Sequence, residues 1–224
     1  EVGFRTVPLP DDFSWTEPPA NLDASLFFLA NPNAPTGVFY PLEAIESFCR
    51  RFPGVVLVDE AYVDFSGGRN ALDLAKKLSN VLVARTMSKS FSLAGLRIGW
   101  AIGSAELIGA LYKLKDSYNV DRLAQALALA ALGDLPWMEA NARKIVATRE
   151  RTAAELRKRG FRIVPSASNF LFVSPPAGTT AAELFARLRQ AKILVRYFPG
   201  GRTGSYLRVS VGTDEQMDAF LAAL

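Results

Sequence analysis

Three short apolar runs, each followed at once by a polar cluster, constrain the fold of this chain more than any other feature. The runs cover residues 26–29, 55–58 and 81–83. They do not alternate between apolar and polar residues, which is typical of strands buried on both faces. Helical patterns lie between the runs, around residues 42–49 and 72–78. This strand–helix–strand alternation predicts an α/β domain with a mostly parallel sheet.

The second half of the chain predicts a smaller α+β unit that follows a long helix. Pro136 is expected as the first residue of that helix, which should stop near Gly160. Other helices are expected to begin at Ser104, Asp121, about Thr180 and Thr213. Further strands are expected near residues 161–164, 169–173, 193–196 and 207–211. We place a domain boundary near residue 120, with a partial large domain over 1–120 and the bridging helix and small C-terminal domain over 121–224.

Composition narrows the possible chemistry. The chain has no histidine, which removes the commonest general base and most zinc and iron sites, so no metal site is expected. Lysine is a poor nucleophile at its free pKa, so a lysine-centred mechanism implies a carbonyl partner. The single cysteine, Cys49, excludes a disulfide within the chain and favours a cytoplasmic location. The net charge of +4 is spread along the chain and no apolar run is as long as a membrane span, so neither a nucleic-acid nor a membrane partner is expected.

Lys89 is the first candidate for catalysis because it follows a predicted buried strand, whose end can hold it rigidly in a cleft. Arg97 lies eight residues further on, beyond a glycine-containing turn that can bring it back toward Lys89. Thr86, Ser88 and Arg97 together offer two hydroxyls and a guanidinium, which suit a phosphate group. The alternative is a loop lysine with ordinary surface serines, and the segment alone leaves both open.

Two further clusters follow the other predicted strands. Asp59 ends an apolar strand, where a carboxylate is costly unless it meets a cation such as a pyridinium nitrogen. Tyr62, three residues on, could donate a hydrogen bond to a ring oxygen. A helix cap for Asp59 and a core position for Tyr62 are the alternatives. Residues 31–37 form a turn rich in Pro, Asn and Gly, which is either a simple connection or a polar wall beside a cofactor.

Taken together, the clusters resemble the motif series of fold-type-I aminotransferases of class I/II, which depend on pyridoxal phosphate (PLP). The motifs that carry the resemblance are residues 31–37, 59–62, 85–91 and 93–99. Within that group the chain is most similar to histidinol-phosphate aminotransferases, also over residues 115–120 and 206–213. The resemblance implies a PLP-dependent transferase fold: a large domain with a mostly parallel sheet and a smaller α+β C-terminal domain.

The resemblance also implies roles for the cofactor-facing residues. Lys89 would form the Schiff base with PLP and then carry the proton between the substrate carbon and the cofactor carbon. Asp59 would pair with the pyridinium nitrogen, and Tyr62 would contact the ring oxygen. The cofactor phosphate would be held by Thr86, Ser88 and Arg97. Many relatives have Asn directly before Pro-Thr-Gly, where this chain has Ala34, so Asn33 or Asn31 is expected to take that place or Tyr62 to act alone.

Three further residues match substrate-binding positions of the family. Arg208 matches the arginine for the α-carboxylate of the amino-acid partner, and Arg196 matches a position that holds the substrate phosphate. Bidentate arginines suit both groups. Tyr118 matches a tyrosine near the substrate. Surface arginines and a core tyrosine are the alternatives.

The function that the resemblance implies is transamination between L-histidinol phosphate and 2-oxoglutarate in histidine biosynthesis, by a cytoplasmic homodimer. Four alternatives stay open: an aromatic aminotransferase, a threonine-phosphate decarboxylase, a ligand-binding module without turnover, and an inactive fragment. The last arises because members of the family carry a long stretch before the point where this chain begins. That stretch holds a phosphate loop and an aromatic residue stacked on the ring, so a chain without it is expected to bind PLP weakly or not at all.

Overall fold

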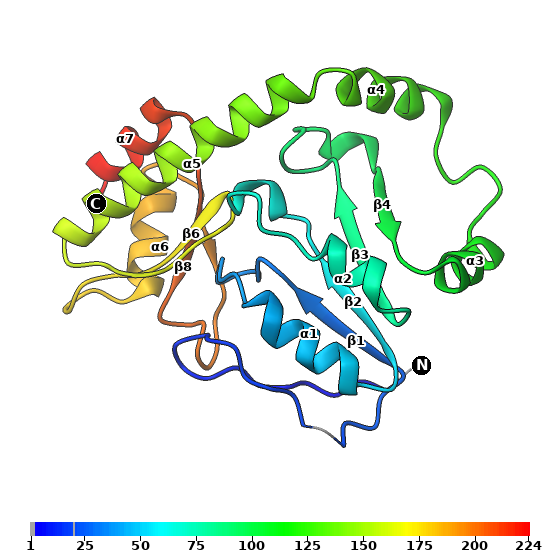
Figure 1. Cartoon of the computed structure of the whole chain (residues 1–224). Helices are drawn as coiled ribbons and strands as arrows, with labels where there is room; N and C mark the ends of the chain where they lie inside the picture. Colours follow the sequence, from blue (N-terminus) through cyan, green and yellow to red (C-terminus); the bar gives the residue numbers. More distant parts are fainter. Residues whose placement is uncertain (1–2, 20) are drawn as a thin grey trace.

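A mostly parallel sheet forms the first half of the molecule. The computed structural model describes residues 3–19 and 21–224. Its first sheet has the strand order β1-β2-β3-β4 (Figure 1). The first three strands are parallel to one another, and β4 is antiparallel to β3. The predicted α/β class with a mostly parallel sheet is therefore confirmed. The strands are β1 (Leu26–Ala30), β2 (Val55–Asp59), β3 (Val81–Thr86) and β4 (Gly99–Ile102).

The helices between these strands cover one face of the sheet. In α1 (Leu42–Arg51) the residues Ile45, Phe48 and Cys49 are buried, as the helical spacing of apolar residues predicts. They pack in one hydrophobic cluster with α2 (Leu72–Lys77) and with inward-facing valines of β2 and β3. Two short 3₁₀ helices, η1 (Val63–Phe65) and η2 (Ala94–Leu96), follow β2 and β3.

The opposite face of the first sheet is open at β1, whereas Leu82 of β3 on the same face is buried. Phe28, in the middle of β1, is 70 % exposed, and Leu26 on the same face is also exposed. The expectation that each strand is buried on both faces is thus wrong for β1. The physical reason is that α1 and α2 pack on the other face, against Phe27 and Leu29.

Three helices lead from the first sheet to the second. They are α3 (Ala105–Leu114), α4 (Arg122–Leu132) and α5 (Leu135–Lys158), and α5 runs alongside both parts of the molecule (Figure 1). Ser104 and Asp121 cap α3 and α4 with their side chains, as predicted. Pro136 is the second residue of α5 and not the first, because Asp134 caps the helix one residue earlier than expected. A proline is tolerated in the first turn because the amides there have no partner within the helix.

The second sheet is antiparallel, with the strand order β5-β6-β8-β7. Capping boxes begin both of its helices, at Thr180 and at Thr213. The expected strand at 193–196 starts three residues too early and overlaps the short β7 only at Arg196, so that element was misplaced. The strands are β5 (Arg162–Val164), β6 (Phe170–Ser174), β7 (Arg196–Tyr197) and β8 (Leu207–Ser210), and the helices are α6 (Ala181–Gln190) and α7 (Asp214–Ala222).

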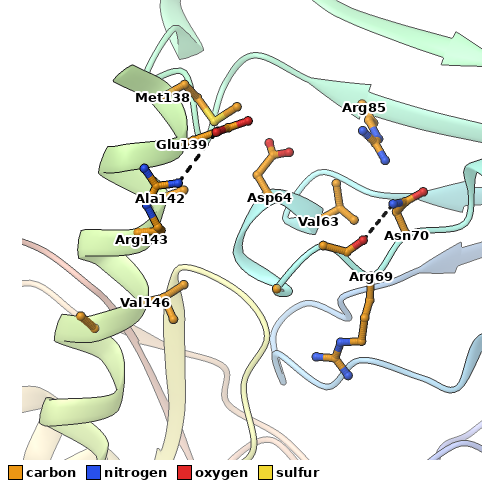
Figure 2. A pocket seen from close by; sticks show the side chains of 13 residues that line it. Val63, Asp64, Arg69, Asn70, Arg85, Met138, Glu139, Ala142, Arg143 and Val146 are labelled. Atoms are coloured by element: carbon orange, nitrogen blue, oxygen red, sulfur yellow. Dashed lines mark hydrogen bonds and ion pairs between the residues drawn. The ribbon is translucent and has the colours of Figure 1, made fainter. Parts of the chain in front are cut away.

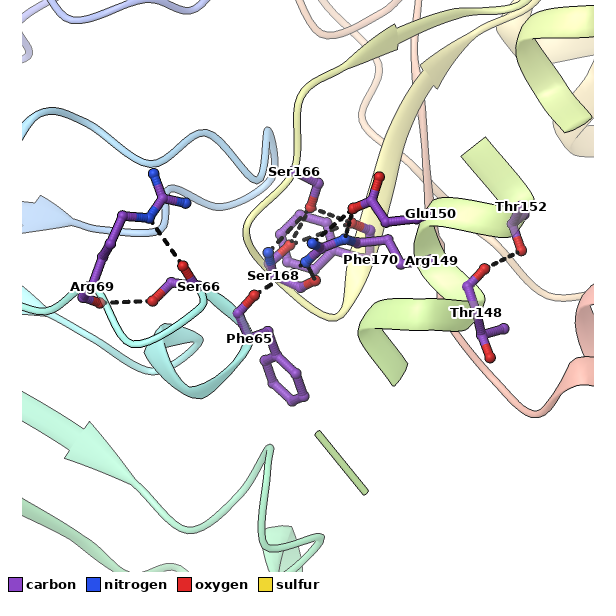
Figure 3. A network of polar contacts seen from close by, with 10 residues as sticks. All are labelled: Phe65, Ser66, Arg69, Thr148, Arg149, Glu150, Thr152, Ser166, Ser168 and Phe170. Carbon is purple, nitrogen blue, oxygen red and sulfur yellow. Dashed lines mark hydrogen bonds and ion pairs between the residues drawn. The ribbon is translucent and has the colours of Figure 1, made fainter. Parts of the chain in front are cut away.

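Arg149 of α5 ties the two halves together (Figure 3). Its side chain is almost fully buried, and its Nη1 donates hydrogen bonds to the carbonyl oxygens of Phe65 at 3.3 Å and Ser168 at 2.8 Å. A second contact joins the turn after β1 to the loop before β6, where the amide of Ala167 donates to the carbonyl of Gly37 at 2.8 Å. The division into domains at residue 120 stays a prediction. No helix in the described part of the chain is long and apolar enough to cross a bilayer.

Candidate functional site

The turn after β3 places Lys89 beside the ring of Tyr62, a residue that follows the neighbouring strand β2. The half-buried side chain of Lys89 puts its Nζ 5.3 Å from the ring centroid of Tyr62, which follows β2. The turn is pinned at both ends, because Met87 and Phe91 are buried in a hydrophobic cluster with Phe65. Among the described residues Lys89 has no ion-pair partner. Its amine is therefore held in place but left available for a ligand.

Asp59, Asn33 and Thr86 line one cavity at the carboxyl ends of the parallel strands. The cavity has a volume of about 570 Å³. The carboxylate of Asp59 is exposed, and its Oδ1 accepts a hydrogen bond from the amide of Ala61 at 2.9 Å. Ligands of open α/β sheets bind at this end of the strands. Lys89 and Tyr62 do not line this cavity themselves.

The three residues expected at a phosphate lie around β3 and the start of β4. The hydroxyl of Thr86 donates to the Oγ of Ser88 at 2.9 Å, and the amide of Ser88 donates back to Thr86 at 3.1 Å. Arg97 has a left-handed backbone, with φ of 55°, and its Nη1 donates to the carbonyl of Ala94 at 2.9 Å. The structure therefore joins Thr86 to Ser88 by hydrogen bonds but shows none between these hydroxyls and Arg97. Their role toward a phosphate stays a prediction.

The two asparagines of the turn after β1 differ in whether their side chains are available to a ligand. Asn31 is fully buried, and its side chain makes hydrogen bonds to both the amide and the carbonyl of Tyr40, at 2.8 and 3.3 Å. Asn33 accepts a hydrogen bond from the hydroxyl of Thr36 at 2.7 Å and faces the cavity. Of the two, only Asn33 is placed to replace the amide that Ala34 lacks.

Arg196 and Arg208 stand directly opposite each other on β7 and β8. Like charges in this position destabilise a sheet unless something compensates. The ring of Phe198 lies 5.5 Å from both guanidinium carbons, and the ring of Phe170 lies 5.1 Å from that of Arg208. Among the described residues neither arginine has an acidic partner, and the buried Nε of Arg208 has no hydrogen-bond partner. Two unpaired guanidiniums on one face are suited to an anionic ligand.

Phe170 connects the two halves of the site and was not identified from the sequence. Its ring contacts the ring of Tyr62 edge to face, with centroids 5.1 Å apart. The guanidinium of Arg208 also lies over the ring of Phe170. Lys89, Tyr62, Phe170 and Arg208 thus form a continuous row of contacts. An apolar residue that starts a buried strand gave no signal for this role. Tyr118, by contrast, is 95 % exposed on the connection between α3 and α4, and no contact joins it to the row, so its role stays a prediction.

Glu60 and Arg85 form a buried ion pair beside the site, and neither residue was expected there from the sequence. The guanidinium of Arg85 lies 2.8 Å from Oε2 of Glu60, whose side chain is fully buried and also accepts a hydrogen bond from the amide of Ala71. Burial raises the pKa of Glu60, and the bonds from Ala71 and Arg85 oppose that rise. Since Glu60 follows Asp59 and Arg85 precedes Thr86, the pair holds the ends of β2 and β3 side by side. The only available signal was a second carboxylate directly after a buried strand.

Comparisons with known proteins agree on one family. The model of the family "Aminotransferase class I and II" matches residues 15–224. A histidinol-phosphate aminotransferase of Geotalea uraniireducens is 46 % identical over 220 residues, which is 98 % of this chain and 63 % of that protein. Histidinol-phosphate aminotransferase 1 of Burkholderia pseudomallei is 45 % identical over 227 residues, covering all of this chain and 63 % of its own length.

A solved structure has the same fold. The crystal structure of histidinol-phosphate aminotransferase from Sinorhizobium meliloti in complex with pyridoxal-5'-phosphate superposes with a TM-score of 0.86 at 29 % identity. The match covers 98 % of this chain and 63 % of that one. The chain thus spans less than two thirds of the length of the relatives it matches.

Proposed function

The chain belongs to the family of class I and II aminotransferases, and from this premise we propose that it carries the lysine and anion-binding side of a PLP-dependent aminotransferase site. The proposed reaction is transfer of an amino group between L-histidinol phosphate and 2-oxoglutarate. The observation that carries the proposal is the row of contacts that leads from the amine of Lys89 to the unpaired guanidinium of Arg208. It joins a nucleophile for a carbonyl group to a receptor for an anion.

The residues present fit the cofactor in charge and type. Asp59 offers an exposed carboxylate with no ion-pair partner among the described residues, which suits a protonated ring nitrogen. Asn33 and Thr86 line the same cavity as Asp59. For the phosphate we propose Thr86, Ser88 and Arg97, and for the ring oxygen Tyr62 with Asn33.

The proposed chemistry is centred on Lys89. When bound, pyridoxal phosphate supplies an electron sink for the electron pair left behind by a substrate proton. Lys89 would hold the cofactor through Nζ, and its amine, when free, would take the proton from the substrate carbon and return it. The ring of Tyr62 against Nζ limits where the amine can move, which fixes the donor–acceptor geometry that proton transfer requires.

The two arginines give the proposed site its substrate class. Arg208, half-buried and with an unpaired Nε, is proposed to hold the α-carboxylate of glutamate. Arg196, exposed on the neighbouring strand, is proposed to hold the phosphate of the other substrate. Tyr118 is proposed as a further substrate contact. A homodimer in the cytoplasm is the proposed assembly and location, and sedimentation velocity of the purified chain tests the former.

The experiment that tests the function is an absorbance spectrum of the purified chain with added PLP, before and after glutamate. At a PLP concentration high enough to load a chain that binds it weakly, we expect a long-wavelength band from lysine-linked cofactor that fades on addition of glutamate. Lys89→Ala should lack the band, whereas Lys76→Ala, an exposed lysine of α2, should retain it as the matched control. No band in the unsubstituted chain would contradict the proposal for this chain.

The same samples separate the proposed reaction from its nearest rival. Transamination with histidinol phosphate leaves the cofactor in the amine form, while decarboxylation of threonine phosphate releases carbon dioxide. Release of carbon dioxide would therefore replace the proposed reaction with the rival one and leave Lys89 in its role.

A further inference from the structure

Ser90, next to Lys89, is hydrogen-bonded to the carboxylate of Asp64, a residue that has no role in the proposed chemistry. Its side chain is 3 % exposed, and its hydroxyl donates a hydrogen bond to Oδ2 of Asp64. A buried hydroxyl is costly without a partner, so this bond matters to the turn. Asp64 belongs to η1, which begins directly after Tyr62.

The other contacts of the turn hold its main chain and its ends. The amide of Ser92 donates to the carbonyl of Lys89 at 3.1 Å, and the amide of Leu93 donates to the carbonyl of Met87 at 3.0 Å. Among the described residues, the bond between Asp64 and Ser90 is the only side-chain hydrogen bond that ties residues 89–91 to another element. The orientation of the turn about its ends therefore depends on it.

The 3₁₀ segment around Asp64 touches the turn at two adjacent residues. The ring of Tyr62 meets Nζ of Lys89 at 5.3 Å, and two residues later Asp64 meets Ser90. We propose that Asp64 is a positioning residue for Lys89: by holding Ser90, its carboxylate keeps the amine of Lys89 against the ring of Tyr62. This inference rests on the proposed function only in taking Lys89 as the reacting amine.

Asp64 is not among the residues that line the cavity of Asp59, Asn33 and Thr86. It lines a neighbouring cavity of about 530 Å³, together with Glu139 and Arg143 of α5 and with Arg85, which lines both cavities. Figure 2 shows its carboxylate between Arg85 on one side and the side chains of α5 on the other. None of the residues proposed to contact the cofactor lines this cavity. Substitution of Asp64 should thus change the lysine turn and leave the cofactor-facing residues in place.

The first test measures hydrogen exchange of the peptide that covers residues 87–93, without any added cofactor. Asp64→Ala and Ser90→Ala should each accelerate exchange there by about tenfold, the effect of losing one hydrogen bond to a charged group. Asp64→Asn should stay close to the unsubstituted chain, because an amide oxygen still accepts the bond. Glu139→Gln, which changes a carboxylate of the same cavity that does not touch the turn, is the matched control.

The second test measures the amine itself. Acetic anhydride labels Lys89 and the exposed Lys113 in the same sample, and mass spectrometry gives the ratio of their rates. The ratio should change by about threefold or more in Asp64→Ala and in Ser90→Ala, and the double variant should change no further, because both remove one bond. Ratios that match the unsubstituted chain, or a change of equal size in Glu139→Gln, would overturn the proposal. Ser90→Ala removes a single hydroxyl and keeps the test valid where Asp64→Ala does not fold.

A third measurement connects the turn to the proposed chemistry. In chains that hold PLP, Asp64→Ala should move the pH midpoint of the absorbance band and lower kcat about tenfold with KM unchanged, since the amine is misplaced while the anion site is intact. Asp64→Asn should restore both. The exchange and labelling experiments need no cofactor, so a missing absorbance band contradicts the proposed function alone and leaves the positioning role to be decided by them.

Discussion

Gly37 permits the close approach between the turn after β1 and the loop before β6, and replacing it by alanine should separate them. Its φ is +83°, in the left-handed region that side chains rarely adopt. A Cβ at this position would lie 2.5 Å from Oγ and 2.9 Å from Cβ of Ser166. Ser166 has little freedom to move, because its hydroxyl donates to the carbonyl of Phe170 at 2.6 Å.

The expected loss of stability has two parts. The left-handed backbone costs an L-residue about 1–2 kcal/mol. Forcing a methyl group into a filled contact costs about 1–3 kcal/mol more. Gly37→Ala should therefore lower the free energy of unfolding by about 2–5 kcal/mol. Gly67→Ala is the matched control, because Gly67 has φ of +75° but no atom within 4 Å of the added Cβ, so that only the first part applies.

Urea denaturation of both variants gives the two free energies. Gly37→Ala should exceed Gly67→Ala by about 1–3 kcal/mol, and adding Ser166→Gly should recover most of that difference. Equal losses in the two variants, or no recovery in the double variant, would refute the reasoning. Such a result would mean that the turn does not pack against Ser166.

Three other perturbations follow from single contacts. Asn80→Ala removes a side-chain amide whose two N–H groups serve three main-chain carbonyl oxygens at 3.0–3.1 Å from Nδ2, and should lower the free energy of unfolding by about 1–3 kcal/mol in a urea titration. Arg149→Met leaves two buried carbonyls without their donor and should cost a similar amount by the same assay, about 1–3 kcal/mol. The hydrogen bond from Thr148 and the ion pair with Arg151 lower the pKa of Asp214, so its contribution to stability is present above the unfolded pKa and is lost as the pH falls through the folded one. The melting temperature should consequently fall less steeply below about pH 4 in Asp214→Asn than in the unsubstituted chain.

The sequence predicted the elements of the first sheet because its signals are local. Apolar runs bounded by polar clusters gave β1 to β3, and side-chain caps gave the starts of α3 and α4. The open face of β1 could not be predicted, since Phe28 belongs to a run that looks the same whether or not a second layer covers it. The position of β7 failed for a similar reason: its two residues gain their pairing from β8, and nothing in residues 193–197 fixes the register.

The sequence alone predicted the candidate site residues at each strand end separately. Asp59, Thr86 and Lys89 each follow an apolar run, and the motif series brought them together as a resemblance. Contacts between distant segments have no local signal, which is why Phe170 and the bond between Asp64 and Ser90 were missed. The contact of Phe170 depends on the packing of the two sheets, and the bond between Asp64 and Ser90 depends on the pairing of β2 with β3.

The open face of the first sheet bears on every stability measurement of this chain. Phe28 and Leu26 expose apolar surface to water on a sheet whose strands β1 and β4, within residues 3–19 and 21–224, each pair on one side only. Such a surface favours self-association of the folded form, and association of the folded form raises the apparent midpoint of unfolding by mass action. Midpoints should thus rise with protein concentration, and the intrinsic stability of the fold is the value approached at high dilution.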